Sequence, residues 1–346
     1  MTRMASMFGH RRVLAAALTL PAVASVRALA ATGVAAHGSA PAEAPSIGGL
    51  LLGWTIEPTV ALPLLVAGVV WLRLVGRVDR AHPGNPVPAR RSVAFLGGLA
   101  AIAVALMSGI DTWDTSLFSV HMAQHILLTL VAAPLIALGA PITLLLRVAT
   151  PAVRRRWILP VLHSRIVRVL AFPVVTWIVF AAVMWGSHFS PLFDASLEQP
   201  LIHDLEHAVY LCAGLLFWWP AVGLDPSPWR MPHPVRAMYV FLQMPQNTFL
   251  AVTITSSSAV LYRHYATLAR AWGPSPLEDQ RVAGSVMWLL GDLLFLAAMG
   301  AILAGWMAHE KRHEADADRR LDRERAAIRD REARLAERLA AERESR

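Results

Sequence analysis

Charged residues are scarce in this chain. Asp, Glu, Lys and Arg together make up 16% of its 346 residues, whereas 55% of the residues are hydrophobic. Soluble globular proteins carry roughly 25% charged residues, so the composition excludes an ordinary soluble domain and predicts a polytopic membrane protein. Cysteine is almost absent as well. Cys212, the single one, lies inside an apolar run, which excludes an intrachain disulfide framework and a cysteine-rich metal motif.

Lysine is nearly missing too. Lys311 is the only lysine among 32 basic residues, so arginines supply the net charge of +8. These arginines gather between apolar segments, as expected of loops on the inner side of a membrane, and nucleic acid is therefore not an expected partner. The chain also lacks an internal repeat and a glycine-rich phosphate-binding loop.

The N-terminus has the pattern of a secretory signal. Arg11 and Arg12 precede an apolar run of about 14 residues, and small residues follow. That run is short for a membrane span, which needs about 20 residues. We therefore expect residues 1–36 to be a signal peptide, cleaved between Ala30 and His37. An uncleaved anchor is the alternative.

Longer apolar segments follow and predict an all-α bundle of seven transmembrane helices within residues 48–308. We expect them near 50–74, 92–110, 118–146, 168–188, 202–222, 235–261 and 283–308. The loops at 73–91, 147–168 and 223–236 are rich in arginine, and the loops between them are acidic or mixed. The positive-inside rule then places the N-terminus outside and the C-terminus inside, which agrees with a cleaved signal and a bacterial inner (plasma) membrane.

Residues 309–346 have a different composition. They alternate Arg with Asp or Glu and contain no Gly or Pro. This pattern predicts a solvated cytoplasmic helix held by charge pairs one turn apart. Leu321, Ile328 and Leu335 recur every seven residues, so a coiled-coil contact is the alternative.

The predicted topology brings histidines from three helices to the outer end of the bundle. They are His121 and His125, His188, and His203 and His207. Two of the sets are spaced i,i+4, which puts both rings on one helix face with Cβ atoms roughly 5–6 Å apart. Paired imidazoles of this kind predict a metal site, with Asp204 or Glu206 accepting the other ring N–H of a ligand. Interfacial histidines that cap helices are the alternative.

Methionines near the same end favour copper. Imidazole binds zinc, copper, iron and nickel, whereas thioether sulfur selects Cu(I). Met122 lies beside His121, and Met184 stands one turn before His188; both are therefore candidate ligands. Met107 and Met287 lie at a similar depth. The alternative is that these methionines only fill the apolar core.

The sixth segment is unusually polar. Gln243, Met244, Gln246 and Asn247 surround Pro245, and such side chains are costly in hydrocarbon unless they face other helices. We expect Pro245 to free a backbone carbonyl near Phe241. Asp292 in the seventh segment needs a partner, and this polar patch is the expected one. Glu57 either faces the histidines or caps its helix.

Three stretches resemble a known family. HMAQHILLTLVAAPLIALGAP (121–141), HDLEH to GLLFWWP (203–220) and QMPQNTF (243–249) are similar to the signature of the multi-span CtaG-type assembly factors of bacteria, which are linked to caa-type cytochrome c oxidases. The resemblance covers residues 48–308. It implies a role in producing active oxidase, through supply of copper, with the motif histidines at positions 121, 125, 203 and 207.

The resulting hypothesis is a non-enzymatic copper chaperone whose partners are oxidase subunits, with periplasmic copper chaperones as further candidates. Two alternatives remain open: a copper transporter that uses the polar sixth segment, and a haem-b quinol oxidoreductase with axial histidines. Histidines spaced i,i+4 lie on one side of a ligand, which argues against haem, because haem takes its axial ligands from opposite faces.

Overall fold

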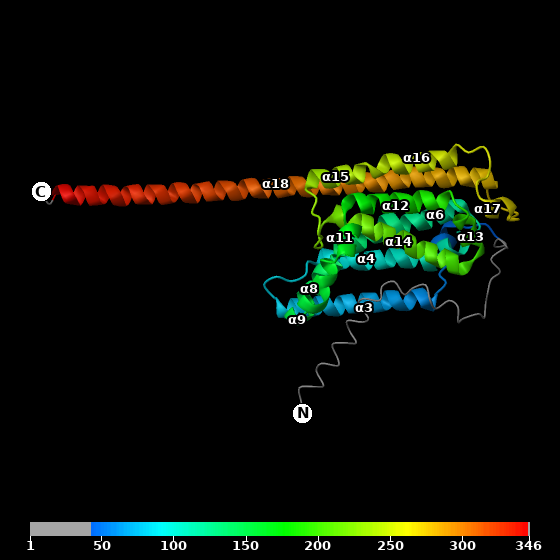
Figure 1. Cartoon of the computed structure of the whole chain (residues 1–346), viewed down its shortest axis with the longest axis horizontal. Coiled ribbons are helices and arrows are strands. Elements are labelled where there is room, and N and C mark those ends of the chain that lie inside the picture. Colours follow the sequence, from blue (N-terminus) through cyan, green and yellow to red (C-terminus); the bar gives the residue numbers. More distant parts are fainter. Residues whose placement is uncertain (1–42, 345–346) are drawn as a thin grey trace, which may run out of the picture. The chain divides into compact units, whose positions relative to one another are not determined.

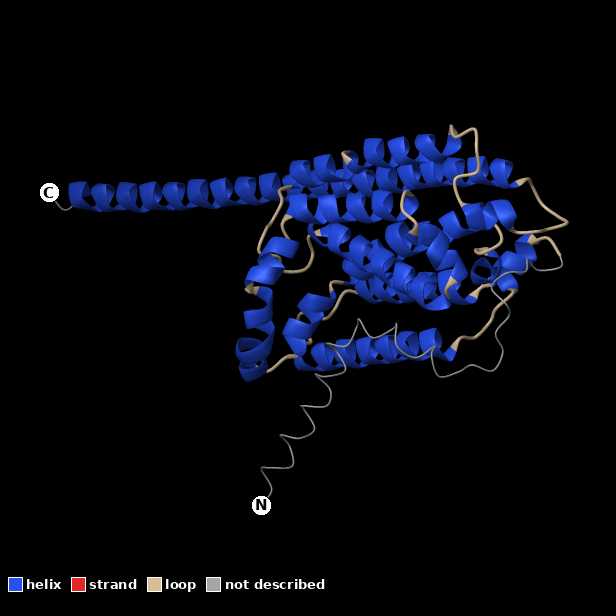
Figure 2. Cartoon of the chain, turned by 45° about the vertical axis from the view of Figure 1, so that its right-hand side comes forward, coloured by secondary structure: helices blue, strands red, loops and turns tan. Residues whose placement is uncertain are grey.

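Helices account for all the regular structure that the chain shows between residues 43 and 344, the range described by the computed structural model (Figure 2). No strand occurs in that range, so the predicted all-α class is confirmed. The predicted signal peptide lies outside the described residues.

The first half of the chain forms two long helices, α3 and α4, and several shorter ones. The bounds are α2 Ile47–Leu52, α3 Pro58–Ala81, α4 Ala89–Met107, α5 Gly109–Trp113, α6 Phe118–Ile126, η3 Leu127–Ala132, α7 Ala133–Gly139, α8 Pro141–Val148, α9 Pro151–Val153, η4 Arg154–Ile158, α10 Leu159–Leu162 and α11 Arg165–Leu170. The elements labelled η are π-helical turns.

The second half contains the longest helices. The bounds are α12 Pro173–His188, α13 Leu192–Glu198, α14 Pro200–Val222, α15 His233–Phe241, α16 Gln243–Thr255, α17 Arg263–Thr267 and α18 Pro276–Glu344. Within the described residues, 43–297 and 298–344 belong to two separate units.

Five of the helical stretches described are long and apolar enough to cross a membrane, and six if the bent pair α12 and α13 forms one span. That pair bends by 68° at residues 189–191. The segment predicted at 235–261 forms α15 and α16, which are separated at Leu242 and are each shorter than 18 residues. The membrane-spanning character is therefore borne out, and the count of seven stays a prediction.

Several boundaries differ from the predicted ones. The first long helix begins at Pro58 rather than near residue 50, because Gly53 ends α2 and an extended stretch follows. Arg73, Arg77 and Arg80, expected in a loop, lie in the last turns of α3. Long basic side chains reach the interface from a helix end, so hydropathy alone ends such a helix too early.

Within residues 43–297, the helices lie side by side with their connections gathered at two ends. Figure 1 shows α13 and α17 at one end, and α8, α9 and α11 at the other. In the centre, α14 packs against α7, η3 and α12, and α4 packs against α7 and η3. The arginine-rich residues 154–156 belong to the α8–α11 end.

The third span widens into the π-helical turn η3. Pro134 has no N–H to give to the carbonyl one turn before it, so the regular ladder is interrupted there. The indole of Trp218 on α14 donates to the Thr129 carbonyl at 2.8 Å. Gly214 allows this approach, since a Cβ there would lie 3.1 Å from the same carbonyl oxygen. The wide turn begins two residues after His125, at the place where α14 crosses.

The unit from Ala298 to Arg346 is a continuation of α18, and the side chains described beyond residue 303 are exposed. Charge pairs occur along it, such as Arg319 with Asp316 and Arg334 with Asp330. The predicted helical character of this segment is confirmed. No break marks residue 309, and the predicted domain boundary there stays a prediction.

Candidate metal centre

The five histidines predicted to converge do lie together. They come from the first turns of α6, the last turn of α12 and the first turns of α14, next to α13. Each is at most 5% exposed: His121, His125, His188, His203 and His207. The i,i+4 spacing produces close ring pairs, with centroids 4.3 Å apart on α6 and 4.2 Å apart on α14.

Glu206 of α14 faces the histidine pair of α6. Its Oε2 lies 3.7 Å from Nε2 of His121 and 4.0 Å from Nε2 of His125. One ligand atom from each of these three residues lies within 4.8 Å of the other two. A cation held at about 2.0–2.2 Å from nitrogen and oxygen would draw these atoms together by about 1 Å.

A second group shares His121. Asp114, in the connection between α5 and α6, places Oδ2 3.5 Å from Nε2 of His203, and His121 completes the group within 4.8 Å. Burial raises the pKa of the Asp114 carboxyl well above its usual range. Asp114 was not among the predicted site residues. The topology places it at the same outer end as the histidines, and this was the signal that could have found it.

The imidazoles of His121 and His125 have buried nitrogens without hydrogen bonds. Within the described residues, neither ring nitrogen of either histidine has a hydrogen-bond partner. Buried polar atoms are nearly always paired in folded proteins, and exceptions call for an explanation such as an ion or a bound ligand. These two residues are therefore the strongest metal-ligand candidates in the cluster.

His207 has a different role in this arrangement. Gln124 donates its amide N–H groups to the Ala105 carbonyl at 3.0 Å and to Asp111 at 3.4 Å, so its Oε1 accepts from Nε2–H of His207 at 3.0 Å. That bond fixes the ring and its tautomer. Gln124 is fully buried and was also missed by the sequence prediction, although it lies between the two histidines of HMAQH.

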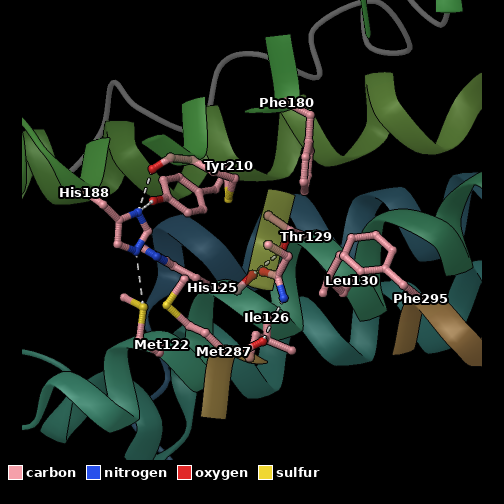
Figure 3. A pocket seen from close by; sticks show the side chains of 12 residues that line it. Met122, His125, Ile126, Thr129, Leu130, Phe180, His188, Tyr210, Met287 and Phe295 are labelled. Carbon is pink, nitrogen blue, oxygen red and sulfur yellow. Dashed lines mark hydrogen bonds between the residues drawn. The ribbon is translucent and has the colours of Figure 1, made fainter. Parts of the chain in front are cut away.

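His188 joins the cluster from α12. Its Nδ1 lies 2.7 Å from the Met184 carbonyl and 3.3 Å from the Tyr210 hydroxyl, and its Nε2 lies 3.4 Å from Sδ of Met122 (Figure 3). The cavity beside it, of about 30 Å³, is lined by both predicted methionines, Met122 and Met184. Tyr210, not predicted, also stacks on the ring of His125 at 3.8 Å.

Contacts from distant segments hold the N-terminus of α6 in place. The carboxylate of Asp279, at the start of α18, accepts from the Phe118 N–H at 2.7 Å and from the Ser119 hydroxyl at 2.6 Å. Tyr265 of α17 donates to the Asp114 carbonyl at 2.7 Å. Such side-chain caps stabilise a helix end by about 0.5–2 kcal/mol. They fix the turn from which both histidines of α6 project.

The polar patch of α16 contacts Asp292, as predicted. Asn247 donates to Oδ1 of Asp292 at 3.1 Å and Thr248 donates to Oδ2 at 2.7 Å. Gln243 donates to Gln246 one turn on. The carbonyl predicted to be freed by Pro245 lies at Phe241, where α15 ends.

Three other predicted residues lie outside the carboxylate–histidine groups described above. Glu57 is at the N-cap position of α3, where its side chain makes no capping hydrogen bond. Asp204 and Met244 are half-buried, and neither belongs to the carboxylate–histidine groups found among the described residues. Asn247, in contrast, lines the cavity next to His188.

Comparison with known proteins gives relatives with no described activity. The chain is 30% identical, over 287 residues, to an uncharacterized protein of Mycobacterium bovis and to another of Mycobacterium tuberculosis, and 30% identical to one of Mycobacterium leprae. In each case the match covers 81% of this chain and 43% of the relative. The chain therefore spans less than half the length of these relatives. No solved structure matches it.

The family comparison is more informative. The family described as cytochrome c oxidase caa3 assembly factor matches residues 69–309. That range holds all three quoted motifs and every histidine of the cluster. This chain therefore belongs to the cytochrome c oxidase caa3 assembly factor family.

Proposed function

We propose that this chain is a non-enzymatic membrane chaperone that binds copper at the cluster of His121, His125, His203 and their carboxylate neighbours, and passes it to a subunit of cytochrome c oxidase. One observation carries the proposal. Two buried imidazoles, to which no side chain or backbone group of residues 43–344 forms a hydrogen bond, face the carboxylate of Glu206. Copper is the cargo here rather than a permanent cofactor.

The chemistry of these side chains suits a divalent transition metal. Imidazole nitrogen with one carboxylate oxygen binds zinc, copper, iron or nickel, and copper binds most tightly of the divalent first-row ions. Gln124 forms a hydrogen bond with His207 and thereby orients the His207 ring beside the site. We favour copper among these metals, since metal delivery is one way in which a member of an oxidase assembly factor family could act.

The membrane orientation follows from charge. Arg154, Arg155 and Arg156 lie at the end of the bundle opposite α13 and α17. The positive-inside rule makes that end cytoplasmic. Seven spans in the bacterial plasma membrane, with α15 and α16 as the sixth, would then place the histidines on the outer side. Oxidase subunits and periplasmic copper chaperones would meet them there.

Metal analysis with X-ray absorption on the purified chain tests the proposal. We expect bound copper with nitrogen and oxygen neighbours, and we expect His121→Ala/His203→Ala to lose that copper together with oxidase activity in cells. The matched control is His163→Ala, because His163 is exposed at the end of α10 and is not one of the clustered histidines. Unchanged copper in the purified double variant would overturn the proposal.

A copper transporter is the second candidate. The observation in its favour is that Asn247 both lines the cavity beside His188 and donates to Asp292 in α18, so polar groups continue inward from the cluster. Copper uptake into cells that depends on Asn247 would favour it. Haem has less support, because a cavity of about 30 Å³ is far too small for a porphyrin.

A further inference from the structure

Beside the carboxylate–histidine groups lies a cavity with a different lining. We propose that Met122, Met184, Met287 and His188 form a second metal position there, which takes a soft monovalent cation, Cu(I). This position is distinct from the one around Glu206 and gives the cluster two sites of different chemistry. The inference rests on the proposed function only for naming copper as the metal.

Three thioethers reach this cavity from three separate helices. Met122 belongs to α6, Met184 to α12 and Met287 to the first turns of α18, and all three line a cavity of about 30 Å³. Figure 3 shows the side chains of Met122 and Met287 reaching toward the His188 ring. A cavity of this size holds a single atom or water molecule. Met107, also near this depth, is not part of its lining.

The contact between Nε2 of His188 and Sδ of Met122 brings together two atoms that carry no hydrogen. The Met184 carbonyl, 2.7 Å from Nδ1 of His188, only accepts, so in the neutral ring Nδ1 carries the proton. Nε2 then presents a lone pair, and it faces the thioether sulfur of Met122, which has no hydrogen either, at 3.4 Å. Two lone-pair donors held together in a buried place suit a shared cation.

The separation of these atoms is right for such a cation. A metal with bonds of about 2.0 Å to nitrogen and 2.3 Å to sulfur, at a tetrahedral angle, separates the two atoms by about 3.5 Å. The observed 3.4 Å therefore requires almost no rearrangement. Met184 and Met287 line the same cavity, and their neutral, soft sulfurs would supply the remaining ligands.

The charge of the lining selects a monovalent ion. None of the described residues around this cavity is a carboxylate, and Ile126, Leu130, Phe180 and Phe295 make much of the wall. A divalent ion would pay a larger desolvation cost in apolar surroundings than a monovalent one, and thioether sulfur prefers Cu(I). Glu206 and Asp114 contact His121, His125 and His203 and are not part of the cavity lining. His125 belongs to both places, since it lines the cavity and faces Glu206.

Silver(I), which resembles Cu(I) but does not change oxidation state, is the probe for this position. We expect the purified full chain in detergent to bind one Ag(I), with sulfur and nitrogen neighbours in X-ray absorption at the silver edge. In Met122→Leu/Met287→Leu we expect at least tenfold weaker Ag(I) binding by calorimetry. Leucine preserves the apolar volume, so the fold is retained. Met238→Leu, at an exposed position on α15, is the matched control.

The proposal is overturned if the double variant binds Ag(I) as tightly as the parent chain. It is equally overturned if the silver spectrum of the parent chain contains no sulfur, a result that needs no variant. Failure of the proposed function gives a different signature: copper content unaffected by His121→Ala/His203→Ala. In that case the Ag(I) affinities of the methionine variants still test the second metal position.

Discussion

The two HxxxH pairs have identical spacing, but their rings make different contacts. His121 and His125 have no hydrogen bond to any ring nitrogen within the described residues, whereas His207 is held by Gln124. The difference arises across the helix interface, where α6 presents Gln124 and α14 presents Glu206. An imidazole nitrogen that already forms a hydrogen bond orients its ring but cannot also bind a metal. A ring whose nitrogens form no hydrogen bond can bind one.

Glu206 is therefore expected to control divalent metal affinity. Glu206→Gln keeps the size of the side chain and removes its charge. We expect affinity for Cu(II) to fall by about 10- to 100-fold, the range seen when residues that support a metal site are removed. Chelator competition on the purified protein measures this. Glu198→Gln, at an exposed position of α13, is the control and should leave affinity unchanged. Equal affinity in both variants would show that Glu206 is not a ligand.

At the level of single residues, the sequence predicted the histidines but not all the side chains that contact them. The i,i+4 spacing and the depth argument found His121, His125, His188, His203 and His207. Gln124 and Tyr210 were missed because their contacts depend on how each helix is rotated about its own axis. One sequence carries no information on that rotation beyond the apolar face. Asp114 lies in the connection between α5 and α6, and only its depth pointed to it.

Among the elements, η3 and α14 depend on each other. The π-helical turn leaves the Thr129 carbonyl without a regular helical partner, and Trp218 donates to it. Gly214 makes the approach possible, since an added Cβ would also lie 3.0 Å from the Cβ of Ala133. The same contact sets the distance between the two helices that carry both histidine pairs.

Two glycine substitutions, one at the interface and one outside it, test whether this packing is tight. Gly214→Ala should lower the free energy of unfolding by about 1–3 kcal/mol, because the methyl group overpacks the interface. Gly186→Ala, in α12 with nothing within 4 Å of an added Cβ, should instead be neutral or stabilise by up to about 1 kcal/mol. Thermal unfolding in detergent measures both. A Gly214 variant as stable as the parent would contradict the packing argument.

The sequence predicted where most helices lie, and less well where they end. Hydropathy found the segments of α4, α14 and α18, which are long and apolar. It did not predict the extended stretch before α3 or the 68° bend between α12 and α13, because breaks set by Gly53 or by the packing of α13 change mean hydropathy little. The break at Leu242 was indicated by Pro245.

On the scale of the whole transmembrane unit, the two ends differ in charge. Arginines gather near α9 to α11, while Asp114, Asp194 and the histidines lie near α13 and α17. The arginines predict, by the positive-inside rule, that their end faces the cytoplasm. Since the histidines lie at the other end, metal is expected to enter and leave at the face away from the cytoplasm.

Thiol labelling tests this orientation, since Cys212 is the only cysteine and can be removed as Cys212→Ala. In that background, Glu198→Cys on α13 and Arg165→Cys on α11 are both at exposed positions. We expect a membrane-impermeant maleimide to label Glu198→Cys in spheroplasts, and to label Arg165→Cys only after the membrane is opened. The reverse pattern would invert the proposed topology.

The cap on α6 also implies an order of events in time. The carboxylate that accepts from the Phe118 N–H belongs to Asp279, 161 residues later in the chain. During synthesis, the helix bearing His121 and His125 is made early and waits with its N-terminus unsupported while the next spans emerge. Only when the start of α18 arrives, bringing Met287 with it, is this end of the bundle complete. We therefore expect the proposed metal site to reach its final geometry only after Met287 has been synthesised.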